Sequence, residues 1–217
     1  MPKLAVSGIQ DFLHDYPGMA IRPSQEISKL TLIGEFDFSA YSGEHEEITD
    51  SYRLQIVVHS SFPRSIPEVK VVENKIPDDG KYHVNSDGTL CLGSRLRLLF
   101  KISSKPTLSG FAELCLVPYL YAVSYKRKFG GEFLFCELLH GISGELLDYV
   151  DLFGLKEPDQ ARSVLCLIAM KKRLANKHSC PCGCGRLLGN CLFNNRIKRF
   201  RDLADRGWYK SLISGMV

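Results

Sequence analysis

Cys91 lies in a segment that contains the residue types needed for nucleophilic chemistry. Residues 82–93 read Tyr-His-Val-Asn-Ser-Asp-Gly-Thr-Leu-Cys-Leu-Gly, so the cysteine sits between an Asp-Gly turn and a glycine. Thiolate is the reactive form of cysteine, and a loop can present its sulfur to a partner. Asn85, a few residues upstream, carries a side-chain amide of the kind that donates to an oxyanion. Periodicity alone also allows the opposite interpretation, in which Leu90-Cys91-Leu92 is a short buried strand with an inert cysteine.

A second group of chemically active side chains lies near the C-terminus, where Cys180, Cys182, Cys184 and Cys191 crowd into one short segment. In a reducing compartment such a cluster predicts a metal site before it predicts disulfides. Zinc takes four such ligands in a tetrahedron, and four protein ligands leave no open position, so the metal is expected to be structural. His178 is the other candidate for the fourth ligand. The alternative is a set of free thiols in a flexible loop.

Composition and charge exclude some classes of protein. The chain has 217 residues, of which 45% are hydrophobic and 24% are charged, an ordinary globular composition. A formal net charge of +4 is too small to imply a dedicated nucleic-acid binder. The basic runs 171–173 and 196–201 are expected to be solvated helix faces. The N-terminus lacks the apolar stretch of a secretory signal and no run is long enough to span a bilayer, so a cytoplasmic location is expected.

The elements that must position Cys91 follow from hydrophobic periodicity. A short amphipathic helix is predicted from Ile9 to Tyr16, because apolar residues recur at helical spacing and Pro17-Gly18 ends it. Alternation predicts strands at 30–38 and 52–58 and a third around 69–72, which together form an antiparallel meander. Residues 76 to about 105 are rich in Gly, Asp, Asn and Ser, and this stretch is predicted to be irregular.

Helices are predicted for most of the remaining chain. One spans 108–125, with Pro118 expected to kink or interrupt it. Others span 137–153, 159–177 after Pro158, and 195–203. The predicted fold class is therefore α+β. The predicted domains are residues 1–155 and a helical extension, 156–217, that contains the zinc motif at 178–192.

The order of these features resembles that of ubiquitin-conjugating enzymes. The likeness rests on the helix, the meander, Phe62-Pro63 with Ile66-Pro67, His83-Val84-Asn85 and Leu90-Cys91-Leu92. That family has a His-Pro-Asn tripeptide shortly before a Cys-Leu nucleophile, and Val84 stands here in place of the proline. The resemblance implies that Cys91 accepts the acyl group, that Asn85 is the oxyanion donor or loop stabiliser, and that His83 holds the loop shape.

The likeness is closest to the bacterial members of anti-phage defence operons. It implies an aminoacyltransferase with a cysteine thioester intermediate and an activating enzyme or other acyl donor in trans. The conjugated partner would be a ubiquitin-like protein or the C-terminus of a nucleotidyltransferase, with no membrane or nucleic-acid partner. The alternatives are a non-catalytic binding module of the same fold and a zinc-dependent nucleic-acid-binding protein.

The cysteine-rich segment resembles the SEC-C motif, a small zinc-binding unit. Cys180, Cys182 and Cys191 match the Cys-Pro-Cys-Gly start and the later cysteine of that motif. Leu192 stands at the position of the final ligand. Cys184 can supply the missing thiolate, and His178 is the alternative.

Overall fold

The computed structural model describes residues 6–23, 26–43, 45–77, 80–134 and 141–216. It forms two compact units, Met1–Glu137 and Leu138–Val217, and each is described by itself. The boundary between the units falls before the predicted boundary at residue 155. Within the described residues, no helix combines the length and the apolar character needed to cross a membrane.

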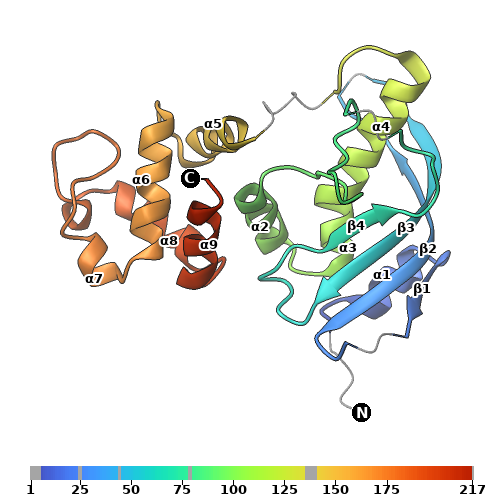
Figure 1. Cartoon of the computed structure of the whole chain (residues 1–217), viewed down its shortest axis with the longest axis horizontal. Helices are drawn as coiled ribbons and strands as arrows, with labels where there is room; N and C mark the ends of the chain where they lie inside the picture. Colours follow the sequence, from blue (N-terminus) through green and yellow to red (C-terminus); the bar gives the residue numbers. More distant parts are fainter. Residues whose placement is uncertain (1–5, 24–25, 44, 78–79, 135–140, 217) are drawn as a thin grey trace. The chain divides into compact units, whose positions relative to one another are not determined.

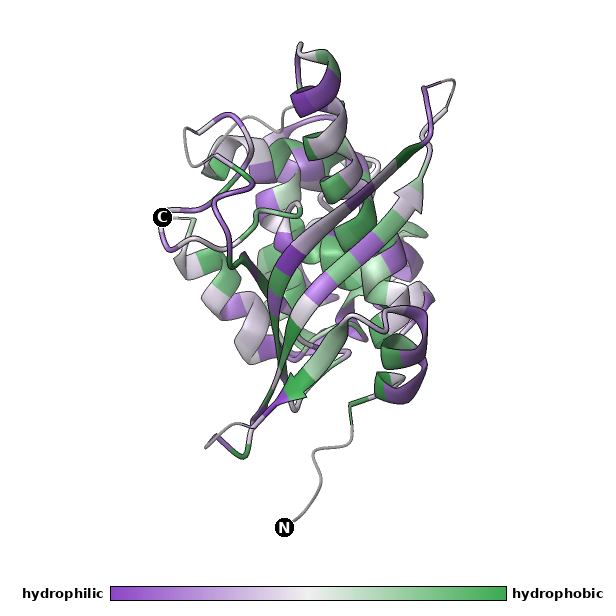
Figure 2. Ribbon diagram, turned by 90° about the vertical axis from the view of Figure 1, so that its right-hand side faces the viewer, coloured by the Kyte–Doolittle hydropathy of each residue, from purple (hydrophilic) through white to green (hydrophobic). Residues whose placement is uncertain are grey.

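The first unit is built on a four-stranded antiparallel sheet (Figure 1). Its strands are β1 (Met19–Arg22), β2 (Lys29–Ala40), β3 (Ile48–His59) and β4 (Glu68–Val71), in the order β1-β2-β3-β4. Hydrophobic and hydrophilic residues alternate along the strands, as Figure 2 shows, because successive side chains point to opposite faces. The mixed α+β class and the antiparallel meander are confirmed. The buried face carries Leu32, Phe36, Tyr52, Leu54 and Ile56.

β1 is a strand that the sequence pattern did not reveal. Only Met19 of its four residues is buried, so it lacks the alternation that identifies a half-buried strand. Met19 pairs with Gly34 of β2, whose φ is 153°. A Cβ at Gly34 would lie 2.1 Å from the carbonyl oxygen of Gly18. The backbone just before β1 therefore approaches β2 so closely that only glycine fits at position 34.

Helices cover the buried face of the sheet. α1 (Ile9–Asp15) is the predicted N-terminal helix, and α3 (Leu108–Phe111) continues through a π-helical segment, Ala112–Leu116, into α4 (Val117–Phe129). α4 packs against β2 and β3.

The π-helical segment lies directly before Pro118, where the sequence predicts a disturbed helix. Proline has no N–H, and its ring crowds the carbonyl four residues earlier, which is that of Leu114. In the structure this carbonyl accepts a hydrogen bond from Lys101 Nζ at 3.3 Å. The helix therefore continues through Pro118 with a changed hydrogen-bonding pattern.

The prediction of irregular structure as far as Lys105 is wrong beyond Ser94. Residues 95–104 form α2 (Arg95–Ser104), whose buried side chains are Leu96, Leu98, Leu99 and Ile102. The Gly, Asp and Asn residues that suggested a loop end at Gly93. The apolar residues beyond Gly93 recur at helical spacing, which is the signal that the composition of the preceding loop obscured.

A polar network joins β3 to α4 beside the buried face. The hydroxyl of Ser124 donates to Asp50 Oδ2 at 2.8 Å and lies 2.7 Å from the hydroxyl of Tyr52. Lys75 Nζ donates to Asp50 Oδ1 at 2.5 Å and lies 4.5 Å from the centre of the Tyr52 ring. Burial acts to raise the pKa of Asp50, but the hydrogen bonds from Lys75, Ser124 and the Ser51 amide outweigh it and hold the pKa below 3.8.

Replacing Asp50 with asparagine should lower the stability of the chain by about 1 kcal/mol at neutral pH. Because the pKa of Asp50 is depressed on folding, the carboxylate contributes stability above pH 3.8, and this contribution is lost as the pH falls through the folded-state value. Urea unfolding from pH 7 to pH 3 should therefore show the wild type and Asp50→Asn converging at low pH. Asp37→Asn, at an exposed position of β2, is the control. A difference that stayed constant with pH would contradict the assignment.

The second unit is helical. It contains α5 (Ile142–Phe153), α6 (Pro158–Ala169), α7 (Lys172–Ala175), α8 (Phe193–Arg201) and α9 (Arg206–Ser214). The predicted start of the first of these helices, residues 137–140, lies outside the described residues. The single predicted helix 159–177 is wrong, because Met170 adopts an extended conformation that separates α6 from α7. α9 was not predicted, and it packs against α6.

Two arginines of α8 bind the C-terminal ends of the neighbouring helices. Arg196 donates to the carbonyl of Phe153, the last residue of α5, at 2.7 Å. Arg201 donates to the carbonyls of Leu167, Ile168 and Met170 at 2.8, 3.1 and 3.1 Å. The last carbonyls of a helix have no partner within it, so both arginines satisfy acceptors that would otherwise be unpaired. The expectation that residues 196–201 form a solvated face is wrong for Arg201, which is half-buried, whereas Arg196 is exposed.

Arg201→Ala should destabilise the second unit by about 2 kcal/mol, because it removes three charge-assisted hydrogen bonds and leaves carbonyls unpaired. The single tryptophan of the chain, Trp208, lies in α9, so its fluorescence reports unfolding of this unit during urea titration. Lys198→Ala changes an exposed cation on the same helix and should shift the free energy of unfolding by less than about 0.5 kcal/mol. Equal effects of the two variants would refute the capping role of Arg201.

Candidate functional site

The segment that carries Cys91 is a short hairpin fastened to the edge of the sheet. Val84 and Leu90 form an antiparallel bridge, and the amide of Cys91 donates to the carbonyl of His83 at 2.8 Å. The amide of Leu90 donates to the carbonyl of Val69 in β4, also at 2.8 Å. Leu90 is buried, and Cys91 is exposed. The backbone of the cysteine is thus fixed while its side chain faces solvent.

Asn85 is engaged in the turn of this hairpin. Its amide Nδ2 donates to Thr89 Oγ1 at 3.0 Å, and the Thr89 hydroxyl donates to Asp87 Oδ1 at 2.6 Å. The hydrogen bonds from the Thr89 hydroxyl and amide lower the pKa of Asp87. Lys70 of β4 adds a hydrogen bond to the Asp87 carbonyl at 2.8 Å. Asn85 therefore stabilises the loop through its side-chain amide.

His83 occupies a backbone conformation that is uncommon for a residue with a side chain. Its φ is 54°, which lies in the left-handed region. Its ring packs edge-on against Phe133, with 4.8 Å between the ring centres. Its carbonyl is the acceptor for the Cys91 amide. These contacts fit a residue that holds the shape of the loop.

Two side chains of α4 bind the irregular segment that precedes His83, and sequence reasoning missed both. The buried Tyr119 donates its hydroxyl to the carbonyl of Tyr82 at 2.6 Å. Lys126 donates to the carbonyl of Lys81 at 3.0 Å. In the sequence, both residues belong to a helical pattern distant from Cys91, and nothing in that pattern indicates a contact with the loop.

Other cysteines of the chain differ from Cys91 in exposure. Cys115 is buried in the π-helical segment, and burial raises its pKa to about 11. Cys166 of α6 is half-buried. Cys136 lies outside the described residues. A thiol with a raised pKa and no exposure is a poor nucleophile at neutral pH.

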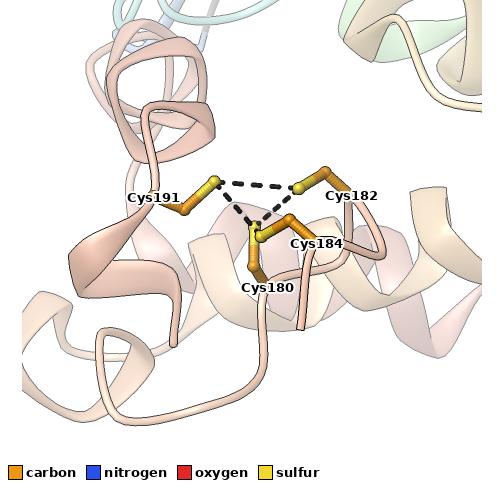
Figure 3. Close-up of side chains that lie close together, drawn as sticks. All are labelled: Cys180, Cys182, Cys184 and Cys191. Atoms are coloured by element: carbon orange, nitrogen blue, oxygen red, sulfur yellow. Dashed lines mark hydrogen bonds between the residues drawn. The ribbon is translucent and has the colours of Figure 1, made fainter. Parts of the chain in front are cut away.

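The four cysteines of the C-terminal cluster come together in the second unit (Figure 3). Their sulfur atoms all lie within 4.8 Å of one another. The sulfur of Cys182 lies 3.2 Å from that of Cys180 and 3.7 Å from that of Cys191, which in turn lies 3.6 Å from the sulfur of Cys184. A tetrahedral zinc site with metal–sulfur distances of about 2.3 Å has sulfur–sulfur edges of about 3.8 Å. The four cysteines therefore lie close enough together to hold one metal ion.

The backbone around the cluster folds tightly to bring these sulfurs together. The amide of Cys180 donates to the carbonyl of Arg186, and the amide of Leu188 donates to the carbonyl of His178, both at 2.8 Å. Gly183 and Gly185 flank Cys184 and have φ values of 79° and 73°, which allow the chain to turn on both sides of this third cysteine.

The thiols of the cluster have different acidities. Burial raises the pKa of Cys180 far above its ordinary value. The backbone amide of Arg186 lowers the pKa of the exposed Cys184 to about 7. A metal ion binds thiolates and displaces their protons, so metal affinity must rise with pH.

The structure brings Cys184 into the cluster and leaves His178 and Leu192 outside it. His178 is exposed, and it is not among the residues whose ligand atoms converge. Leu192, which stands at the final ligand position of the SEC-C pattern, is 85% exposed. The fourth ligand that the cluster provides is thus Cys184.

Cys184→Ser should reduce the metal bound per chain after purification, whereas His178→Ala should leave it unchanged. The reason is that Cys184 contributes one of the four converging sulfurs and His178 contributes none. Elemental analysis of the purified full-length chain after dialysis against a chelator makes the measurement. Metal loss in His178→Ala together with full retention in Cys184→Ser would reverse the ligand assignment.

Comparison with known proteins supplies no family for this chain: no protein-family model, no curated protein and no solved structure matches it.

Proposed function

We propose that the chain is a ubiquitin-conjugating-enzyme-like acyl carrier in which Cys91 forms a thioester and transfers the acyl group to an amine. The observation that supports this most directly is the exposed Cys91 on a hairpin whose backbone is fixed on both sides. The element order adds support, because an N-terminal helix, a four-stranded meander, the cysteine hairpin and then helices follow one another as in that family.

The reaction proceeds in two nucleophilic steps. The Cys91 thiolate attacks the carbonyl carbon of a donor thioester, a carbon–sulfur bond to Cys91 forms, and the donor leaves as a thiolate. A lysine amine of the target then attacks the new thioester, an amide bond forms, and the Cys91 thiolate leaves. The proton lost by the amine passes to solvent.

Few catalytic groups are required, because positioning and charge stabilisation supply much of the rate for a reactive thioester. Asn85 would hold the loop with one amide hydrogen and donate the other to the oxyanion. His83 would keep the loop in shape. The proposed donor is an activating enzyme or another thioester-bound protein in trans, and the conjugated chain is a ubiquitin-like protein or the C-terminus of a nucleotidyltransferase in anti-phage defence.

We further propose zinc as the metal of the cysteine cluster. Four thiolates at tetrahedral spacing suit zinc, and they leave no open coordination position for chemistry. Cys180, Cys182, Cys184 and Cys191 would hold the ion, and the tight loop between them would be stable only with the metal bound. The bound ion would stabilise the fold of the second unit.

One observation keeps nucleic-acid binding as a second candidate function. Aspartate and glutamate are absent from Gln160 to Arg201, while lysine and arginine recur through this stretch. A surface of single sign attracts polyanions. Arg196 and Arg201 are nevertheless engaged as helix caps, which removes two cations from such a role.

The acyl-carrier role predicts a thiol-sensitive adduct on the wild-type chain when it is co-expressed with its genomic neighbours. Non-reducing gels should show this adduct, added thiol should remove it, and Cys91→Ala should abolish it. Cys91→Ser should replace it with an adduct that resists thiol, because an oxyester forms instead. The mass of the adduct identifies the donor.

Cys166→Ser is the matched control, since it removes a half-buried cysteine of the second unit and should leave the adduct intact. An adduct that survived Cys91→Ala would exclude Cys91 as the carrier. If no adduct formed, retained partner binding in Cys91→Ala would establish a binding module. Salt-sensitive binding to an oligonucleotide would instead favour the nucleic-acid role.

A further inference from the structure

α4 and the Cys91 hairpin meet at two backbone carbonyls. Tyr119 and Lys126 are seven residues apart, so both side chains leave the same face of the helix. Tyr119 donates to the carbonyl of Tyr82 at 2.6 Å, and Lys126 donates to the carbonyl of Lys81 at 3.0 Å. Lys126 Nζ also lies 5.5 Å from the centre of the Tyr82 ring. The segment that leads into the hairpin is thereby attached to a helix that also packs against β2 and β3.

The attachment reaches Cys91 through a short path of backbone. Tyr82 precedes His83, and the carbonyl of His83 accepts the amide of Cys91 at 2.8 Å. His83 has a left-handed conformation, which is held by its neighbours and not by its own preference. Phe133 packs against the rings of both His83 and Tyr119, with ring centres 4.8 and 5.9 Å apart. A shift at Tyr82 is therefore transmitted to the residue that fixes Cys91.

The hydroxyl of Tyr119 also lies within electrostatic range of Cys91. Burial raises the pKa of Tyr119, and negative charge on Cys91 acts in the same direction.

We infer that Tyr119 is a positioning residue for Cys91, which acts by holding the Tyr82 carbonyl and through it the His83–Cys91 hydrogen bond. This positioning role rests on the proposed acyl-carrier function of Cys91. The nucleophile itself remains Cys91. Tyr119 stabilises the loop conformation in which the Cys91 sulfur is exposed and the Cys91 amide is hydrogen-bonded to the His83 carbonyl.

Tyr119→Phe removes this hydrogen bond with little change in volume, and Tyr121→Phe provides a matched control. Tyr121 lies on the same helix, has a buried side chain and also donates to a backbone carbonyl, that of Glu46 at 2.9 Å, in the loop between β2 and β3. The two variants should lose similar global stability, which thermal unfolding measures. Only Tyr119→Phe should loosen the Cys91 hairpin.

Two measurements on the full-length chain distinguish the variants without any acyl donor. Hydrogen exchange at the Cys91 amide should be about fivefold faster in Tyr119→Phe, which corresponds to loss of about 1 kcal/mol from local opening. It should be unchanged in Tyr121→Phe. The time profile of Cys91 alkylation by iodoacetamide at one fixed pH, followed on the Cys91 peptide by mass spectrometry, should change in Tyr119→Phe and coincide with the wild type in Tyr121→Phe.

Wild-type exchange and an unmoved alkylation profile in Tyr119→Phe would overturn the inference. Equal acceleration in both variants would also overturn it, because that result reports global destabilisation. Neither outcome depends on thioester formation, so a failure of the acyl-carrier proposal is seen separately in the gel experiment with Cys91→Ala.

Discussion

The packing of α4 on the sheet is the contact on which the first unit depends. β2 and β3 present one continuous apolar face, and the helix that covers it removes that face from water, which is the main source of stability in such a domain. The same helix also carries buried polar side chains that form hydrogen bonds with other parts of the unit. Ser124 bonds Asp50 of β3, Tyr121 bonds the loop between β2 and β3, and Tyr119 bonds the segment before the Cys91 hairpin. Core packing and loop geometry therefore share one element.

The second unit uses a different source of order. Its helices are short, and the C-terminal ends of α5 and α6 are bonded to arginines of α8. Its four clustered cysteines lie in a loop whose residues 183–187 are all exposed. Such a loop lacks the buried area to fix itself, and a bound metal would supply the missing constraint. Gly183 and Gly185 allow the loop to turn this tightly, because residues with a Cβ rarely adopt two left-handed conformations so close together.

Periodicity predicted the elements that bury a regular stripe and failed where burial is irregular. The meander was predicted because Tyr52, Leu54 and Ile56 alternate with polar residues along β3. β1 escaped notice because its pairing depends on Gly34 and not on its own side chains. α2 was obscured by the loop composition that precedes it. In the candidate site, the cysteines were evident as residue types, whereas Tyr119 and Lys126 act through tertiary contacts that leave no pattern in the chain.

The proposed thioester chemistry would place two opposed requirements on Cys91, and the hairpin meets each of them separately. The sulfur has to be exposed so that a protein-sized donor can approach it, but exposed loops sample many conformations and lose the entropy advantage of positioning. In this chain the side chain of Cys91 is exposed, while the amides on either side of the turn are bonded to the hairpin and to β4. The buried hydrogen bond from Tyr119 then carries the rigidity of the core to the loop. Because only the backbone is restricted, a partner protein can still approach the sulfur. A site with few polar groups can therefore hold its cysteine in a defined position.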